Sequence, residues 1–452
     1  MRPCVPEVSH PAIRWSSRIT FITAAAGAAI GLGNIWKFPY LVGENGGGAF
    51  VLVYLLCVLA AGLPIMMAET LLGRMGRKNP VDSLLSLSKT YQKTRLWALI
   101  GWLGITAGLA ILSYYSVVAG WGMAYLFKMS GGFLANITPE ESLRTFDELK
   151  SSPDTQTIWH SVFMVLTALI VGRGLKEGIE SVTRIMIPCL LVILILLVGY
   201  GATTNGFAKS AAFLFQPDFS KLTGEGVLIA LGQAFFSLGL ANGTTLIYGS
   251  YLPEEVSIAR TALWVASADT LAAILAGLAI FSIVFANGME PSAGPGLIFE
   301  TLPIAFGSMP LGWLFGTTFF ILVFFAAITS AIALIEPAVS FLSEKWGLSR
   351  ARASVIAASA CWLLGLGTVH SFQQGKTSDG AHFYEVIDFL TADLMLPMGG
   401  ILISVFAAWV VPKAISEAEL DAGKAYSIWL LLTRFVAPLA VLVIFLRAMN
   451  WI

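Results

Sequence analysis

The chain has 452 residues, 57% of them hydrophobic and 12% charged, and this charged share is about half of the ~25% found in soluble domains. The formal net charge is zero, so the composition gives no reason to expect a nucleic-acid partner. The apolar residues come in runs long enough to cross a bilayer as helices. This pattern predicts an all-α polytopic membrane protein in which residues 1–452 form a single transmembrane domain.

Eleven transmembrane helices are predicted in chain order. The first five cover residues 18–41, 48–75, 96–127, 157–171 and 179–202. The remaining six cover residues 226–248, 259–286, 311–344, 350–366, 384–411 and 425–448. Residues 129–156 carry several acidic side chains and are expected to form a solvated outer loop, whereas residues 291–306 are too apolar for a free loop and are expected to fold as a short helical hairpin.

The distribution of basic side chains sets the expected orientation. Placing the N-terminus in the cytoplasm puts most of the 27 Lys and Arg residues in inner segments, as the positive-inside rule requires. An odd number of spans then places the C-terminus outside. We therefore expect a multi-pass protein of the plasma (inner) membrane with a cytoplasmic N-terminus.

The first predicted helix contains the sequence GAAIGLGNIWKFP at residues 27–39. Gly27, Gly31 and Gly33 are followed at once by the polar Asn34 and the charged Lys37. Each glycine weakens a helix by about 1 kcal/mol relative to alanine, and a helix broken in hydrocarbon frees backbone groups that lipid cannot satisfy. The pattern therefore predicts a discontinuous helix whose open backbone forms a binding site near the bilayer midplane.

A second break is predicted in the sixth helix, where residues 237–243 read SLGLANG. Five helices separate the starts of the two broken helices, so a repeat of that length enters the membrane from the opposite side. Matching breaks in two oppositely oriented halves are typical of transporters built from inverted repeats. The sequence thus predicts one repeat over residues 18–202, a second over residues 226–411, and an additional helix at residues 425–448.

Ionisable residues inside predicted spans are costly and commonly mark a functional site; this chain has Lys37, Glu69, Asp269, Glu336 and Asp388. The alternative is a structural hydrogen bond or ion pair within the bundle. For Glu69 and Glu336 we favour the structural role, because both stand near prolines, where a helix break leaves donors to satisfy. For Asp269, midway along the seventh helix, we favour function.

Several polar side chains in the predicted spans carry oxygen atoms that could bind a cation. Thr329 and Ser330 lie in the eighth predicted helix, where such residues alone usually bond to the preceding turn or join helices. Together with Asn34, Asp269 and unwound backbone at two breaks, they supply the oxygens that a hard cation such as Na+ prefers. Freed N–H groups at a half-helix N-terminus suit a carboxylate. The residues therefore predict an ion-coupled carrier of a carboxylated solute.

Several longer motifs closely resemble those of the neurotransmitter:sodium symporters, over nearly the whole chain: GLGNIWKFP (31–39), ENGGGAF (44–50), GLP (62–64) leading to Glu69, QAFFSL (233–238) and AAITS (326–330). The resemblance implies the 5+5 inverted repeat of the bacterial leucine transporter, with helices 1 and 6 broken among eleven. It also implies sodium-coupled import of a neutral amino acid by alternating access. The expected partners are the amino acid, sodium ions and the lipid bilayer.

The same resemblance implies two sodium sites and a substrate pocket. The first sodium site would use the Ala29 carbonyl, Asn34, Ser237, Asp269 and the substrate carboxylate. The second would use the Gly27, Ile30 and Ala326 carbonyls with the Thr329 and Ser330 hydroxyls. The substrate would meet residues of both broken helices and of two neighbouring helices, namely Ala29, Leu32, Gly33, Ile111, Tyr115, Phe236, Ser237, Gly239, Leu240, Asn242, Ser330 and Leu334.

The gates are also implied by the resemblance. Phe236 would be an aromatic lid over the substrate, with Lys37 and Asp388 closing an outer gate above it. Lys37 stands where the family usually has arginine, so this gate would pair through a point charge rather than a planar fork. The family's inner-gate arginine falls at a position occupied here by alanine, so Arg14 is expected to take its place and pair with Glu344.

Other departures from the family pattern bear on the substrate and the ions. Gly239 replaces a serine and Asn242 an aromatic residue of the leucine-transporter pocket, which leaves the substrate side chain open. Gly31 stands where monoamine carriers have an aspartate, so the substrate should keep its carboxylate. Asp269 places a fixed negative charge where chloride-dependent relatives have asparagine, which predicts chloride-independent transport.

Two other kinds of function are also compatible with the sequence. A channel or a transport-dead receptor could share the fold and the binding site. An intramembrane enzyme could use Asp269 and Asp388 as an acid pair, although these residues fall on the seventh and tenth predicted helices without a nucleophile motif.

Overall fold

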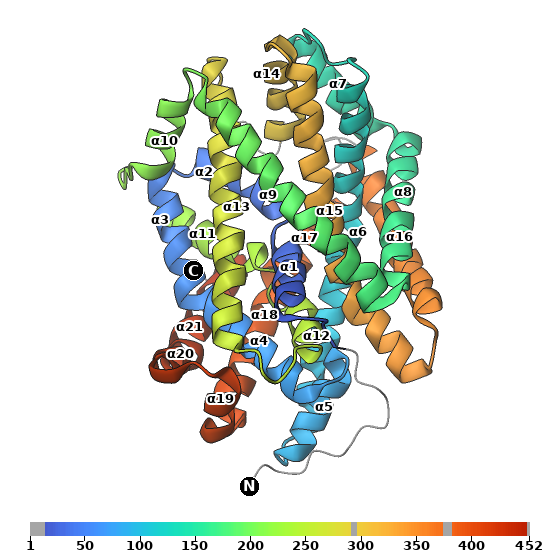
Figure 1. Ribbon diagram of the computed structural model, residues 1–452, viewed down its shortest axis with the longest axis vertical. Coiled ribbons are helices and arrows are strands. Elements are labelled where there is room, and N and C mark those ends of the chain that lie inside the picture. The colour runs from blue at the N-terminus through green and yellow to red at the C-terminus, as the bar shows by residue number, and fades with distance from the viewer. Residues whose placement is uncertain (1–13, 291–295, 374–381, 450–452) are drawn as a thin grey trace.

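The computed structural model describes residues 14–290, 296–373 and 382–449, and these residues are almost entirely helical (Figure 1). The helices of the first half are α1 (Arg18–Ala29), α2 (Phe38–Glu44), α3 (Gly48–Cys57), α4 (Leu63–Gly76), α5 (Pro80–Thr90), α6 (Leu99–Ser130), α7 (Pro139–Ser151), α8 (Pro153–Gly172), α9 (Ser181–Ala202) and α10 (Phe207–Phe215). Those of the second half are α11 (Gly224–Ser237), α12 (Thr244–Ser250), α13 (Ile258–Ala286), α14 (Leu302–Ser308), α15 (Gly312–Trp346), α16 (Arg350–Gln373), α17 (Phe383–Asp388), α18 (Leu396–Val405), α19 (Lys413–Leu420), α20 (Tyr426–Leu431) and α21 (Ala437–Ala448).

The described residues confirm a polytopic membrane protein. Nine of their helices are long and apolar enough to cross a bilayer, and a bent pair of helices makes a tenth span. The predicted span 226–248 appears as two shorter helices, α11 and α12, so the count of eleven stays a prediction. Short π-helical segments join several pieces into continuous spans, as in Gly48–Gly76 and Phe383–Val410.

The first span is broken where the glycines predict it. α1 ends at Ala29, and a π-helical turn, Gly33–Lys37, leads into α2. The two parts are bent by 50°. The C-cap residue of α1, Ile30, is extended, with φ −70° and ψ 94°, so the chain leaves the helix at the midpoint of the span.

The sixth predicted span is interrupted over residues 238–243, between α11 and α12. Gly239, Ala241 and Gly243 have φ values of +59°, +62° and +80°. Left-handed backbone of this kind cannot continue a right-handed helix, and it is costly for any residue except glycine. The two glycines therefore allow the break, while Ala241 is held in its conformation by a contact described below.

α15 and α6 form the centre of the bundle, and α15 is buried over most of its length. α1, α9 and α12 pack against α15, α8 and α16 pack against both α6 and α15, and α13 packs on α1 and α9 (Figure 1). α7 and α14 lie at one end of the long axis, the upper end in Figure 1, and α5 and α19 lie at the other. This arrangement places both helix breaks inside the protein rather than against lipid.

The expectation of a plain solvated loop over residues 129–156 is wrong, because α7 forms there. Thr138 and Glu141 make a reciprocal capping box, in which each side chain accepts the other residue's backbone N–H. These bonds hold the pKa of Glu141 below its ordinary value. Phe146 is buried and stacks on Phe299, with ring centroids 5.1 Å apart, so α7 covers the helical segment Leu297–Ser308. The first residues of the expected hairpin, 291–295, lie outside the described residues.

Candidate binding site

The first helix break and the facing break meet at a buried polar cluster. Asn34 Nδ2 donates to Asp269 Oδ1 at 2.7 Å and to Ser237 Oγ at 3.0 Å. Ser237 Oγ in turn donates to Asp269 Oδ2 at 2.8 Å, and Tyr54 Oη donates to the same oxygen at 3.3 Å. Asn34 Oδ1 accepts the Gly31 N–H at 3.0 Å. The carboxylate of Asp269, fully buried in α13, is thus held by donors from three other elements.

Two further side chains satisfy backbone groups that the breaks expose. Gln233 Nε2 donates to the Gly33 carbonyl at 2.9 Å. Glu69 Oε1, on α4, accepts the N–H of Ala241, the residue with left-handed backbone in the second break. The structural role predicted for Glu69 is therefore confirmed, because the carboxylate stabilises an unwound segment of the sixth span.

Tyr115 reaches the backbone of the first break from α6. Its hydroxyl oxygen accepts the Leu32 N–H at 3.3 Å. A Cβ atom at Gly31 would lie 2.5 Å from Ser330 Oγ and 3.2 Å from Tyr115 Oη. Glycine at position 31 therefore leaves space that a side chain would fill, directly beside hydroxyl groups of α6 and α15.

A cavity of about 850 Å³ of atom-free space, counting its opening toward solvent, lies between the two breaks. Of the residues predicted to bind substrate, Leu240 does not line this cavity; it is fully buried in the second break. The others all line it, namely Ala29, Leu32, Gly33, Ile111, Tyr115, Phe236, Ser237, Gly239, Asn242, Ser330 and Leu334.

A second group of oxygens lies at the end of α1, on the side that faces α15. Ser330 Oγ is 3.2 Å from the Ala28 carbonyl and 3.4 Å from the Gly27 carbonyl. A Cβ at Gly27 would lie 3.4 Å from the Cβ of Thr329, so these two helices approach closely. The structure thereby brings Gly27, Thr329 and Ser330 together, as the second predicted site requires.

The remaining members of that group differ in their surroundings. Thr329 Oγ1 donates to the Phe325 carbonyl at 2.9 Å and to the Ala326 carbonyl at 3.2 Å, which is the ordinary bond of a threonine to its preceding turn. Ile30 is the C-cap residue of α1, and the last carbonyls of a helix have no partner within it. Carbonyl and hydroxyl oxygens therefore face one another where α1 ends.

The expected pair of Lys37 and Asp388 is not formed. Among the described residues no ion pair within 4.0 Å joins them, and Lys37 Nζ instead lies 4.5 Å from the centroid of the Phe236 ring. The negative face of an aromatic ring attracts a cation, so the lysine is placed on the predicted lid rather than on the acid. The two expected parts of the outer gate, Lys37 and Phe236, thus contact each other directly.

The expected pair of Arg14 and Glu344 is likewise not formed. Arg14 is exposed, and Glu344 Oε2 accepts both the backbone N–H and the side-chain amide of Asn79, each at 2.8 Å. Its other oxygen accepts Ser340 Oγ at 2.8 Å. Because Asn79 is the N-cap of α5, Glu344 is engaged by a helix N-terminus and offers no contact to Arg14 within the described residues.

Trp15, just before α1, packs edge-on against Phe21 and Tyr248, two residues that line the cavity. Its backbone N–H donates to the Tyr251 carbonyl at 3.2 Å, and its indole N–H donates to the Tyr248 carbonyl at 3.0 Å. Glu336 is paired with Arg350 at 2.6 Å and accepts the Tyr251 hydroxyl at 2.8 Å. This confirms the structural role predicted for Glu336 and ties α15, α16 and the end of α12 together.

Sequence reasoning missed Tyr54, Gln233 and Trp15. Tyr54 and Gln233 are ordinary members of apolar helices in the sequence, and only the folded packing brings them to Asp269 and Gly33. Trp15 stands just before α1 in a polar segment, where a buried tryptophan is not expected. A weak signal existed for it, since an isolated tryptophan beside an N-cap serine is a suitable anchor for the chain entering a helix.

Comparison with known proteins agrees with this geometry. Residues 13–142 and 143–451 match the sequence profile of the Sodium:neurotransmitter symporter family. The chain is 38% identical to the sodium-dependent transporter YhdH of Bacillus subtilis, over 96% of this chain and 97% of that one. It is 26% identical to the sodium- and chloride-dependent taurine transporter of Bos taurus, over 88% and 71%.

A solved structure extends this likeness to three dimensions. The crystal structure of MhsT in complex with L-phenylalanine superimposes with a TM-score of 0.89 at 40% identity, covering 96% of this chain and 99% of that one. A match at that level of identity and coverage supports the helical transporter fold over 96% of the chain.

Proposed function

The chain belongs to the sodium:neurotransmitter symporter family, which makes it a transporter rather than an enzyme, and on that premise we propose that it imports a neutral amino acid together with sodium by alternating access. The observation that carries this proposal is the cluster of Asn34, Ser237 and Asp269 between the two helix breaks. It offers amide, hydroxyl and carboxylate oxygens, which suit a hard cation, and its Ser237 lines the cavity between the breaks.

We assign two sodium sites to the two groups of oxygens. The first comprises the Ala29 carbonyl, Asn34, Ser237 and Asp269, and it is completed by the carboxylate of the substrate. The second comprises the Gly27, Ile30 and Ala326 carbonyls with the hydroxyls of Thr329 and Ser330. Because the substrate carboxylate belongs to the first site, sodium and substrate strengthen each other's binding by the same factor.

The substrate carboxylate would lie at the first break, against the Leu32 and Gly33 N–H groups and the Tyr115 hydroxyl. In the structure the Leu32 N–H already points to Tyr115 Oη, so the donor is directed into the cavity. Gly31 leaves room beside these groups, and an aspartate there would repel the carboxylate. These features favour an α-amino acid over an amine that lacks a carboxylate.

The substrate side chain would be apolar or aromatic. The cavity wall includes Ile111, Phe236, Leu334 and Leu396, together with polar side chains such as Asn242, Thr244 and Thr245. The MhsT structure, which resembles this chain so closely, contains L-phenylalanine. Apolar walls bury an uncharged side chain favourably, whereas a charged one would lose its hydration without gaining a partner.

Transport should not need chloride. Asp269 supplies a fixed negative charge in contact with Asn34 and Ser237, and this charge balances a sodium ion where a bound chloride would otherwise be required. Uptake that disappears when chloride is replaced by gluconate would overturn this part of the proposal.

We further propose that residues 18–202 and 226–411 are the two inverted repeats and that the protein lies in the plasma (inner) membrane. The end that carries α5 and α19 would face the cytoplasm, since it is rich in basic residues and basic loops stay inside. The N-terminus is then cytoplasmic and the C-terminus is outside.

The test is uptake of labelled amino acids into proteoliposomes with an inward sodium gradient, against the same vesicles in choline. A screen of the twenty amino acids by thermal shift with and without sodium selects the candidate to label. Sodium-dependent accumulation supports the proposal, and equal uptake in choline refutes it. Counterflow with labelled substrate separates a carrier from a channel or a transport-dead receptor of the same fold, because only a carrier accumulates label transiently when unlabelled substrate leaves the vesicle.

A further inference from the structure

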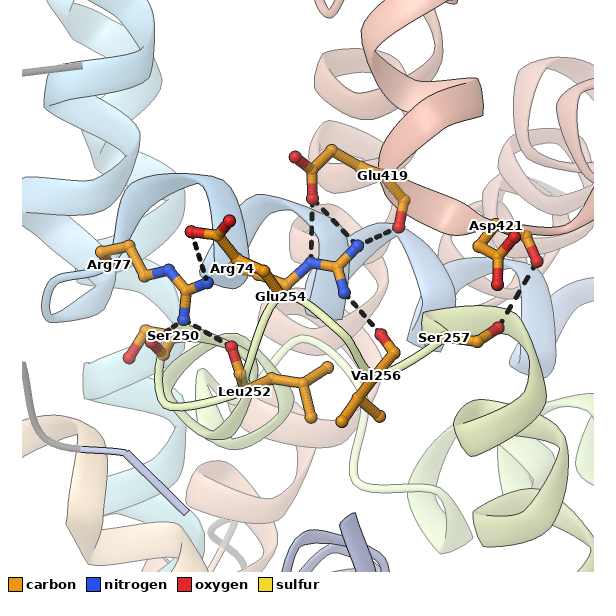
Figure 2. Close-up of polar contacts among 9 residues, drawn as sticks. All are labelled: Arg74, Arg77, Ser250, Leu252, Glu254, Val256, Ser257, Glu419 and Asp421. Atoms are coloured by element: carbon orange, nitrogen blue, oxygen red, sulfur yellow. Dashed lines mark hydrogen bonds and ion pairs between the residues drawn. The ribbon is translucent and has the colours of Figure 1, made fainter. Parts of the chain in front are cut away.

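A buried arginine joins three segments at the end of the bundle proposed to face the cytoplasm. Arg74, in the last turn of α4, has a side chain that is 4% exposed. Its Nε donates to Glu419 Oε2 at 2.9 Å, its Nη2 donates to the Glu419 carbonyl, and its Nη1 donates to the Val256 carbonyl at 2.6 Å. Figure 2 shows the guanidinium between Glu419 of α19 and the connection from α12 to α13. One planar group thus fixes α4, α19 and this connection to one another.

A second arginine, one turn further along, holds the same connection. Arg77 Nη1 donates to the Leu252 carbonyl and lies 3.4 Å from the Ser250 carbonyl (Figure 2). Ser250 is the last residue of α12, so Arg77 places a positive charge at the negative end of that helix. Its contact with Glu254, a solvent-exposed side chain 3.7 Å away, contributes little.

α4 and α12 are in backbone contact above these arginines. A Cβ at Gly73 would lie 1.9 Å from the Leu246 carbonyl oxygen, and a Cβ at Gly249 would lie 2.6 Å from the Thr70 carbonyl oxygen. Helices that approach so closely have no side chains between them that could rearrange. α12 therefore follows α4, and whatever holds the end of α4 also sets the position of the inner half of the sixth span.

The same turn of α12 receives Trp15. The Tyr248 and Tyr251 carbonyls accept the two N–H groups of Trp15, while the neighbouring Ser250 and Leu252 carbonyls accept Arg77. The arginines thus fix the segment on which the start of α1 docks. Trp15 packs against the outer side of Phe21 and Tyr248, which line the cavity, so the geometry of this short segment determines whether this part of the cavity wall stays covered.

α19 is anchored on its far side as well. Ser416 Oγ and Tyr426 Oη lie 2.7 Å apart, and Tyr426 Oη donates to the Lys413 carbonyl at 3.2 Å. Leu420 is fully buried. α19 is therefore packed against the start of the last span and held to α4 by Glu419, which gives it the position of a strap across the end of the bundle (Figure 1).

We infer that α19 is a strap that holds the cavity closed toward the cytoplasm, with the Arg74–Glu419 pair as its fastening. The ion pair between Glu419 and Arg74 orients the arginine, which is hydrogen-bonded to the connection between α12 and α13. This connection positions the last turn of α12, and the carbonyl groups of that turn bind Trp15. Release of Glu419 lets the start of α1 leave α12. The inference rests on the proposed alternating access for its biological meaning, but Arg74, Glu419 and Val256, where the contact chain begins, do not line the cavity.

The test is hydrogen–deuterium exchange of the purified full-length protein, comparing wild type with Glu419→Gln and Glu417→Gln. Glutamine at 419 keeps the length of the side chain and the backbone carbonyl but removes the charge, and hydrogen bonds to charged groups are the stronger ones. Glu417 is exposed, two residues earlier on the same helix, and therefore on the opposite face. Wild type, loaded with neither sodium nor substrate, gives the reference rates, so the outcome does not depend on the proposed transport.

We expect Glu419→Gln to raise exchange of α1 (Arg18–Ala29) and of residues 251–257 by about tenfold, since opening events govern exchange of such segments. Exchange of α15 should stay unchanged, and Glu417→Gln should match wild type throughout. The inference is overturned if α1 exchanges within twofold of wild type in Glu419→Gln, or if the increase is confined to α19. If Glu419→Gln is not monodisperse, Glu419→Asp, which keeps the charge on a shorter side chain, is measured by the same criteria.

Discussion

Neutralising Asp269 by Asp269→Asn tests the proposed first sodium site most directly. The substitution keeps the size of the side chain and one carbonyl oxygen, so the packing of α13 is retained. What it removes is the charge, which in the structure is held by Asn34, Ser237 and Tyr54. Because these donors orient the carboxylate before any ion arrives, the charge is available to the ion at little further cost in reorganisation.

The magnitude follows from Coulomb's law. A sodium ion about 4 Å from the carboxylate carbon gains about 4 kcal/mol at an effective dielectric constant of ~20. Part of this gain is kept by the amide oxygen, so we expect the sodium concentration for half-saturation to rise roughly 100- to 1000-fold. Burial of the site, with Asp269 fully inaccessible to solvent, argues for the upper part of this range.

The assay is binding of labelled sodium to the purified protein, with sodium-dependent thermal shift as a second readout. Asp393→Asn is the control, because Asp393 is another acid within a span but belongs to neither proposed sodium site. It should leave sodium affinity within about twofold of wild type, a difference well below the ~1.4 kcal/mol of a tenfold change. Half-saturation of Asp269→Asn within threefold of wild type would refute the reasoning, since the ion would then not be sensing this charge.

Three further substitutions separate substrate from sodium. Gly31→Ala places a methyl group 2.5 Å from Ser330 Oγ and should weaken substrate binding at least tenfold in a scintillation-proximity assay, whereas Gly232→Ala, at a position with open space around it, should not. Thr329→Val removes a proposed ligand that does not line the cavity and should weaken sodium binding by roughly tenfold, about the value of one hydrogen bond, with substrate binding at saturating sodium unchanged. Tyr115→Phe removes the hydroxyl that accepts the Leu32 N–H and should weaken substrate binding about tenfold; equal affinity would place the carboxylate elsewhere.

The sequence was sufficient for the features that depend on local chemistry. Glycines at 27, 31 and 33 predicted the first break, and the chain bends by 50° at this position. Glu69 was expected to satisfy a helix break, and it does so at Ala241. In each case the cost of unsatisfied backbone in a bilayer leaves few alternatives, so the residue type alone is informative.

Long side chains at the two ends of the bundle were less predictable. Lys37 and Asp388 have opposite charges and suitable positions, but Lys37 lies on the Phe236 ring. Glu344 was expected to pair with Arg14, but it accepts hydrogen bonds from Asn79 at the N-terminus of α5 instead. A flexible charged side chain has several partners of similar energy, and the choice among them depends on packing that no sequence pattern encodes.

Side chains of the protein itself stabilise the two helix breaks, and this affects how ion binding can be coupled to substrate binding. The side chain of Asn34 accepts a hydrogen bond from the Gly31 N–H, Gln233 donates to the Gly33 carbonyl, and Glu69 accepts from the Ala241 N–H. If the ions had to unwind these helices, each binding event would first cost several unsatisfied backbone groups. Because these side chains already satisfy the exposed backbone groups, the free energy of ion binding in the proposed mechanism would favour closure of the site around the substrate. The Leu32 N–H could then exchange its hydrogen bond to Tyr115 for one to a carboxylate.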